Sequence, residues 1–154
     1  MGISHTVDER GIATRLLDAG AEVVICGRSE PASVPSATDG SGRAASFLAA
    51  DVRDPAEVDA LIDAIVERHG HLDLAVNNAG GSPNTEAATA SPRFSESIVR
   101  LNLLAALHVA QRANSQMQQQ EREQRDSERD RDREEHTPAD ICARCHGLSN
   151  AATP

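Results

Sequence analysis

Four consecutive apolar residues, Val23, Val24, Ile25 and Cys26, form the centre of the segment AEVVICGR at positions 21–28. A strand with one face in water alternates apolar and polar side chains, whereas a strand covered on both faces is apolar throughout. The run therefore predicts a parallel strand of an α/β protein, buried between helices on both sides.

Helix-like and strand-like segments alternate along the first 120 residues. A helix is expected over 10–20, before the apolar strand at 21–28, and a second short strand is expected at 46–52. A third strand at 72–76 precedes a long helix from about 92 through 120. This alternation predicts an α/β fold, a partial Rossmann-like, doubly wound parallel sheet of about three strands with flanking helices.

The clearest helix signal lies at 54–70. Asp54 is the expected N-cap, Pro55 is the first helical residue, and Glu57 would complete a capping box. An apolar stripe follows, and Gly70 is suited to end the helix. The spacing predicts a helix between the second and third strands.

The composition changes abruptly after Gln120. Residues 121–135, EREQRDSERDRDREE, contain no apolar side chain, which leaves two alternatives, a solvated helix or a disordered segment. We therefore expect an incomplete Rossmann domain over 1–120 and a charged, disordered or loosely helical tail over 121–154.

A short cysteine motif lies in this tail. Cys142, Cys145 and His146 match the haem-attachment pattern C-x-x-C-H, and together with His136 they have the ligand types of a zinc site. Because no fold pattern surrounds the motif, we assign it neither a metal nor a haem.

The overall composition excludes several classes of function. A formal net charge of −9 is unsuited to nucleic acid. No apolar run approaches the roughly 18 residues of a membrane helix, and the polar start MGISHTVDERG lacks a signal-peptide pattern, so a cytoplasmic protein is expected. Three cysteines, an odd number, argue against a disulfide framework. The chain contains no Tyr, and all 15 basic residues are Arg, so no mechanism can use a phenol or an ammonium side chain.

Four segments, in order, carry a resemblance to a known family. They are GIATRLLDAGAEVVICGR, ADVRDPAEV, LDLAVNNAG and IVRLNLLAALHVAQ, which lie between residues 10 and 120. Their order and spacing resemble the short-chain dehydrogenase/reductase family, single-domain Rossmann oxidoreductases. The resemblance implies NAD(P) binding at the carboxyl ends of the strands.

The resemblance assigns cofactor contacts to the ends of the first two strands. Arg28, which has no carboxylate beside it, implies a contact with the 2′-phosphate, and so NADP(H) preferred over NAD(H); the alternative is a solvated side chain. Asp51 would meet the adenine amino group, and the Val52 backbone would lie along the ring. The alternative for Asp51 is a turn residue before the Asp54 cap.

The resemblance also assigns roles at the third strand end and in the helix after it. Asn77 and Asn78 would tie the central strands together, while Ala79 and Gly80 would let the cofactor ribose approach the backbone. Asn102 corresponds to the Asn that supports a water linked to the active-site Lys. Since the chain has no Lys, we interpret Asn102 as a supporting remnant of the catalytic set that bridges its helix to the neighbouring strand end.

Two departures from the family pattern bear on activity. The glycines of the family's phosphate-binding loop would fall at Ile3, Val7 and Glu9, and a carboxylate there would repel a dinucleotide. After Gln120 the family would continue with a catalytic Ser and Tyr-x-x-x-Lys, and neither follows here. We hypothesise a disrupted reading frame or a truncated gene, which translation of the other two frames around codon 120 would test.

Three functional readings follow from these observations. The first is a short-chain dehydrogenase/reductase-like NADP(H)-binding fragment with weak dinucleotide affinity at best and no turnover. The alternative is a non-catalytic interaction module that pairs through helix 92–120 with a full-length relative, because family members commonly oligomerise through the equivalent helix. A metal-binding tail on a folded half is the third.

Overall fold

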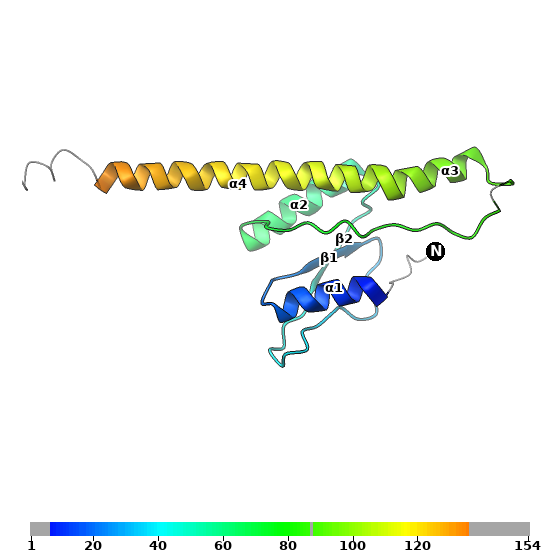
Figure 1. Ribbon diagram of the computed structural model, residues 1–154, viewed down its shortest axis with the longest axis horizontal. Helices are drawn as coiled ribbons and strands as arrows, with labels where there is room; N and C mark the ends of the chain where they lie inside the picture. The colour runs from blue at the N-terminus through cyan, green and yellow to red at the C-terminus, as the bar shows by residue number, and fades with distance from the viewer. Residues whose placement is uncertain (1–6, 87, 136–154) are drawn as a thin grey trace, which may run out of the picture. The chain divides into compact units, whose positions relative to one another are not determined.

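The computed structural model describes residues 7–86 and 88–135 (Figure 1). The chain divides into two units, Met1–Ser115 and Gln116–Pro154. The first unit contains a parallel sheet with helices and is described first. Figure 1 shows α1 and α2 on opposite sides of its two strands, which is the layering expected of a doubly wound α/β fold.

Helix α1 spans Val7–Asp18 and buries Ala13 and Leu17. It begins three residues before the predicted start and ends two residues before the predicted end. The chain leaves the helix through Gly20, which has a φ of 92° and donates its N–H to the Leu17 carbonyl at 3.0 Å. Gly20 is suited to this position after the helix end, because a positive φ favours glycine.

Strands β1 (Val24–Gly27) and β2 (Ser46–Ala49) pair in parallel, with Val24 opposite Ser46 and Gly27 opposite Ala49. The parallel α/β class is therefore confirmed, although both strands are shorter than predicted. The side chains of Val24 and Ile25 are only half-buried, so the prediction of burial on both faces is wrong for β1. The physical reason is an open cavity beside this strand, described below.

The loop between the two strands is tied to α1 by hydrogen bonds. The Thr38 N–H and hydroxyl donate to the two carboxylate oxygens of Asp18 at 2.5 and 2.8 Å, and these bonds hold the pKa of Asp18 below its ordinary value. The Arg43 Nε donates to the Leu17 carbonyl at 2.9 Å. The segment between the two strands is a loop with one isolated antiparallel bridge, Ser36 to Ala44.

Helix α2 spans Pro55–His69, in close agreement with the predicted 54–70. Asp54 is the N-cap, and its Oδ1 accepts from the Ala56 N–H at 2.9 Å. Gly70 ends the helix with a φ of 83° and donates its N–H to the Val66 carbonyl at 2.8 Å. The helix buries three side chains of the apolar stripe, Val58, Leu61 and Ile62.

The predicted capping box is not formed. Glu57 Oε2 accepts from the Asp51 N–H at 2.7 Å, whereas a capping box needs the Asp54 N–H. The Asp54 N–H instead donates to the Asp51 carbonyl at 2.9 Å. The tight turn after β2 thus provides an acceptor for the Asp54 N–H. The Glu57 carboxylate is therefore available to accept from the Asp51 N–H.

The predicted third strand at 72–76 is wrong, since residues 71–86 contain no regular secondary structure. Leu74 and Val76 are 58% and 49% exposed. A strand exists only as part of a hydrogen-bonded ladder, and β1 is not paired with this segment in the described part of the chain.

The predicted helix at 92–120 is a continuous run of three elements. Helix α3 (Pro92–Val99) begins at the N-cap Ser91, the π-helical turn η1 spans Arg100–Leu104, and α4 spans Ala105–Glu135. Of the two alternatives for 121–135, the helix is the one found, so α4 ends fifteen residues beyond the predicted boundary. In the second unit, amide–carboxylate bonds four residues apart support it, such as Gln119 to Glu123 at 2.8 Å.

The buried apolar side chains of the first unit are mostly small. They are Ala13, Leu17, Ala45, Ala50, Val58, Leu61, Ile62, Ala105 and Ala113. Among residues 7–86 and 88–135, no helix has the combined length and apolar character that a membrane crossing requires.

Candidate functional site

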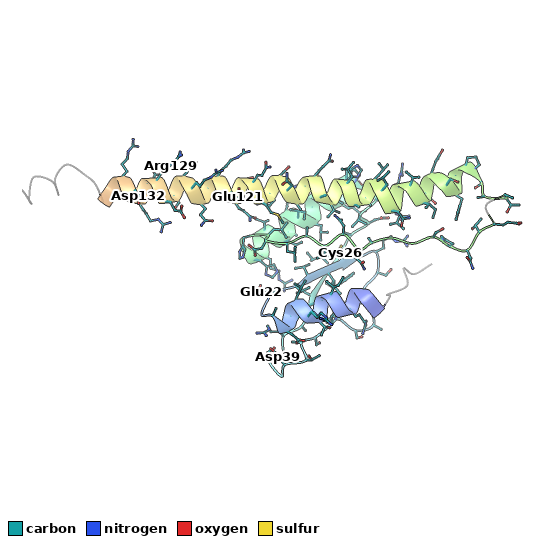
Figure 2. All side chains as sticks on the ribbon, viewed as in Figure 1. Glu22, Cys26, Asp39, Glu121, Arg129 and Asp132 are labelled. Atoms are coloured by element: carbon teal, nitrogen blue, oxygen red, sulfur yellow. The ribbon has the colours of Figure 1, made fainter. Side chains whose placement is uncertain are left out.

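A cavity of about 1120 Å³ lies beside β1 in the first unit. Residues 23–28 form one wall and residues 71–79 form another, with side chains from α1, α2 and α4 completing the lining. Figure 2 labels Glu22 and Cys26, which lie just before β1 and within it and which both line the cavity. The cavity therefore extends along the whole of this strand.

The cavity beside β1 is lined by most of the predicted site residues. Arg28, Val52, Asn77, Asn78 and Ala79 all line the cavity. They follow β1, β2 and the segment 72–76, as predicted from the strand ends. Three other predicted residues, Asp51, Gly80 and Asn102, do not line it.

The Asp51 carboxylate is turned onto its own loop. The Arg53 Nε donates to Asp51 Oδ1 at 2.8 Å, and the Arg53 guanidinium also pairs with Oδ2. The hydrogen bond from Arg53 is the main reason that the pKa of Asp51 lies below its ordinary value, and the charge of Arg28 adds to the effect. The Asp51 carboxylate is thus already engaged by Arg53 within its own turn.

The Asn102 side chain connects η1 to the segment after Ala79. Its Oδ1 accepts from the Gly81 N–H at 2.8 Å, and its Nδ2 donates to the carbonyls of Gly81 at 3.0 Å and Ile98 at 2.9 Å. This is the bridging contact expected of Asn102, made to an irregular segment in place of a strand end. A π-turn at this position is consistent with a local adjustment of the helix that lets the amide face Gly81.

Gly80 lies against the same amide. A Cβ at position 80 would be 2.8 Å from Asn102 Oδ1, closer than two such atoms can approach. The side chain of any other residue would therefore displace Asn102 or the backbone. The absence of a side chain at Gly80 thus makes room for the Asn102 amide.

Sequence reasoning missed one interaction at the opposite end of β1. The Nδ1 atom of His69, at the end of α2, lies 2.5 Å from Glu22 Oε2. Its Nε2 is buried and has no hydrogen-bond partner in the described part of the chain, and His69 lines the cavity. The two residues are 47 positions apart, so neither pattern nor spacing signals the pair.

The predicted phosphate-loop positions lie at the start of the chain. Ile3 is outside the described residues, and Val7 and Glu9 have helical backbone in α1. The backbone at these two positions is therefore helical and not an open loop. The motif at Cys142, Cys145 and His146, with His136, also lies outside the described residues, and within 7–86 and 88–135 no three His, Cys, Asp or Glu side chains are grouped to hold a metal ion.

Comparison with known proteins decides the ancestry of this site. Residues 9–124 match the short chain dehydrogenase family, which is more than half of the chain. The chain belongs to the short-chain dehydrogenase family. Its members are oxidoreductases with a Rossmann fold that bind nicotinamide dinucleotides.

Individual members of the family resemble the chain over about two thirds of its length. L-fucose dehydrogenase of Oryctolagus cuniculus is 37% identical over 105 residues, which are 67% of this chain and 36% of that protein. The aldohexose dehydrogenase of Thermoplasma acidophilum matches with a TM-score of 0.60 and 26% identity, over 70% of this chain and 39% of the other. A variant of actinorhodin polyketide ketoreductase with NADPH matches with a TM-score of 0.61 and 29% identity, over 73% and 44%. The chain thus spans less than half the length of these relatives.

Proposed function

We propose that this chain forms the adenosine side of a nicotinamide-dinucleotide site and prefers NADP(H) to NAD(H). The observation that carries the proposal is that Arg28, Val52 and residues 77–79 all line the same cavity. Ligands of open α/β sheets bind outside the carboxyl ends of the strands, which is where Arg28 and Val52 lie. The guanidinium of Arg28 would bind the 2′-phosphate by a charge-assisted hydrogen bond.

Affinity is expected to be low. An adenine amino group that bound Asp51 would compete with the bond from Arg53, which already engages both carboxylate oxygens. The helical backbone at Val7 replaces the open glycine loop that would donate N–H groups to the pyrophosphate. The engaged Asp51 carboxylate and the helical backbone at Val7 would both weaken dinucleotide binding. Neither changes the expected contact of the ribose with residues 77–79.

Calorimetric titration with NADPH and NADH tests the proposal. We expect a dissociation constant below about 1 mM for NADPH and weaker binding of NADH. Arg28→Ala should remove the difference between the two, whereas Arg15→Ala, an exposed residue of α1 outside the cavity lining, should leave it unchanged. Equal or absent binding of both dinucleotides by the unsubstituted chain would refute the cofactor assignment.

We also propose that the chain alone has no turnover. The family's proton relay uses a Tyr whose pKa is lowered by a Lys, and this sequence contains neither residue. Asn102 has its amide committed to Gly81 and Ile98, so it would act only as a structural remnant of the catalytic set. Oxidation of NADPH by a panel of aldoses, ketoacids and ketones, followed at 340 nm, should stay at the rate of the blank. A rate that rises with protein concentration would contradict this prediction.

A second candidate function, a non-catalytic interaction module, rests on a different observation. Val99, Leu103 and Leu107 are spaced four residues apart on α3, η1 and α4, and they are 49%, 61% and 47% exposed. Apolar side chains in one such row favour association with another helix. Sedimentation of the chain mixed with a full-length family member should show a complex that Leu103→Glu abolishes and Ser97→Glu, on the exposed surface of α3, preserves. A mixture that sediments as two separate species would exclude it.

A further inference from the structure

Asp39 and Gly40 form the one place in the sequence where an Asp or Asn is followed by Gly. They lie at the tip of the loop between β1 and β2, and Figure 2 labels Asp39 at the outer end of this loop. A hydrogen bond from the Ala37 N–H to the Arg43 carbonyl, at 2.8 Å, closes the base of the tip. Residues 38–42 are all exposed, so water reaches the peptide bond between Asp39 and Gly40.

The Asp39 carboxylate is turned toward the backbone that follows it. Its Oδ1 accepts from the Ser41 N–H at 2.9 Å, and the Gly40 nitrogen lies between the two residues in the chain. A bond of this kind, from a side chain to the backbone two residues on, holds the carboxyl carbon close to the nitrogen between them. A Cβ at position 40 would have nothing within 4 Å, so the tip has room for a ring at this place.

The same carboxylate is paired with Arg43. The Arg43 Nη2 atom lies 2.7 Å from Asp39 Oδ2, and the Arg43 Nε donates to the Leu17 carbonyl of α1 at 2.9 Å. Hydrogen bonds from Ser41, together with the charge of Arg43, hold the pKa of Asp39 below its ordinary value. The carboxylate is therefore ionised at neutral pH, which is the form that resists the loss of an oxygen atom.

We propose that Asp39 and Gly40 form a site of spontaneous isoaspartate formation and that the ion pair with Arg43 restrains the reaction. The Gly40 nitrogen attacks the side-chain carboxyl carbon of Asp39 and loses its proton, while the carboxyl group loses one oxygen as water, which gives a succinimide ring. A second water then adds to the main-chain carbonyl carbon of Asp39 and breaks the bond from that carbon to the Gly40 nitrogen, which regains a proton. The chain now continues through the side-chain carbon of residue 39, and its main-chain carbon has become a free carboxylate.

This reaction requires no other reagent. Nothing is oxidised or reduced, and the water that is released in the first step is matched by the water that is consumed in the second. The inference is independent of dinucleotide binding and of the cavity beside β1.

The product would weaken the attachment of the loop to α1. Isoaspartate adds one carbon to the backbone at residue 39 and places the carboxylate directly on its Cα, which changes the geometry of the pair with Arg43. The two bonds from the adjacent Thr38 to the Asp18 carboxylate, at 2.5 and 2.8 Å, depend on the same turn of the chain. The modified chain, separated by chromatography, should therefore unfold at a lower urea concentration than the unmodified chain.

Incubation of the full chain at neutral pH in heavy-oxygen water tests the proposal. Opening of the ring places one heavy oxygen atom in residue 39, which peptide mapping by mass spectrometry detects. Electron-transfer fragmentation of the same peptide distinguishes isoaspartate from aspartate. We expect both signals at residue 39 to grow with time, whereas Asp39→Glu, whose longer side chain closes such a ring far less readily, should show neither.

A pair of arginine variants tests the restraint. Arg43→Gln should raise the rate in the folded chain at least about threefold, because more of the Asp39 carboxyl group is then neutral. Arg93→Gln, which removes an exposed charge from α3, should leave the rate unchanged. In concentrated urea, where the ion pair is absent, the unsubstituted chain and Arg43→Gln should react at the same rate.

Three outcomes would overturn the proposal. They are absence of heavy oxygen at residue 39 after prolonged incubation, equal rates for the folded unsubstituted chain and folded Arg43→Gln, and equal urea midpoints for the modified and unmodified chains. Because the first measurement uses the unsubstituted chain, it decides the question even where a variant does not fold.

Discussion

At the scale of single residues, Asn102 and Gly80 form one unit. The amide of Asn102 holds the backbone of Gly81 by two hydrogen bonds, and the absent side chain of Gly80 makes room for it. Gly80→Ala should therefore lower the free energy of unfolding by about 1–3 kcal/mol through the clash with Oδ1. Urea unfolding followed by circular dichroism measures the change.

A double-mutant cycle separates this clash from other effects of the substitution. In the background of Asn102→Ala, the obstructing amide is gone, so Gly80→Ala should cost less than half as much. Equal costs in the two backgrounds would show that the contact between the two residues is not the cause.

The Asp51 carboxylate makes stability depend on pH. Its folded pKa lies below the ordinary value of 3.8, chiefly because of the hydrogen bond from Arg53. A carboxylate with a lowered folded pKa contributes stability above its unfolded pKa, and this contribution is lost as the pH falls through the folded value. Asp51→Asn should therefore flatten the dependence of the urea midpoint on pH below about pH 5 relative to the unsubstituted chain. Parallel curves for the two proteins would contradict the assignment.

Residue roles differed in how far the sequence could predict them. An Asn inside an apolar helix signals a bonded amide, and that signal was sufficient for Asn102. The pair between Arg53 and Asp51 is local, two residues apart, and follows from charge once the turn is known. The contact of His69 with Glu22 depends on the end of α2 lying next to the start of β1. The two residues are 47 positions apart, so no local sequence pattern predicts the contact.

At the scale of elements, local signals determined helices better than strands. Asp54, Pro55 and Gly70 predicted both ends of α2 because capping bonds form between residues close in sequence. The segment 72–76 has an equally strong apolar pattern and forms no strand. Its ladder would need a neighbour distant in sequence, and β1 is not hydrogen-bonded to it.

The charged end of α4 provides an element-scale prediction. Side chains 121–133 are exposed, so this part of the helix depends on backbone propensity and on pairs such as Gln124 to Glu128, and not on burial. Ser127→Pro should reduce the helical circular dichroism at 222 nm, because proline costs about 3 kcal/mol inside a helix, while the urea midpoint of the first unit stays the same.

Ser127→Ala is the matched control and should keep or increase the helical signal. A lower urea midpoint for Ser127→Pro but not for Ser127→Ala would show that the end of α4 contributes to the stability of the first unit.

At the scale of the whole molecule, the cavity beside β1 couples binding to stability. A dinucleotide that binds only the folded chain stabilises it by RT ln(1 + [L]/Kd), about 1.4 kcal/mol at ten times its Kd. NADPH should therefore raise the urea midpoint of the first unit, by an amount that grows with the logarithm of its concentration above Kd. NADH at the same concentration should raise the midpoint less, and a shift of equal size with both dinucleotides would contradict the proposed preference for NADP(H).

The sequence by itself determined the helices, the parallel α/β class, the family, and the identity of the residues at the ends of the strands. These follow from capping, periodicity and residue order, which act over a few positions or are read directly from the chain. Only the tertiary structure decided that 72–76 forms no strand, that the Asn102 amide faces Gly81, and that a cavity lies beside β1. Each of these depends on hydrogen bonds or packing between segments distant in sequence, whose formation no local pattern specifies.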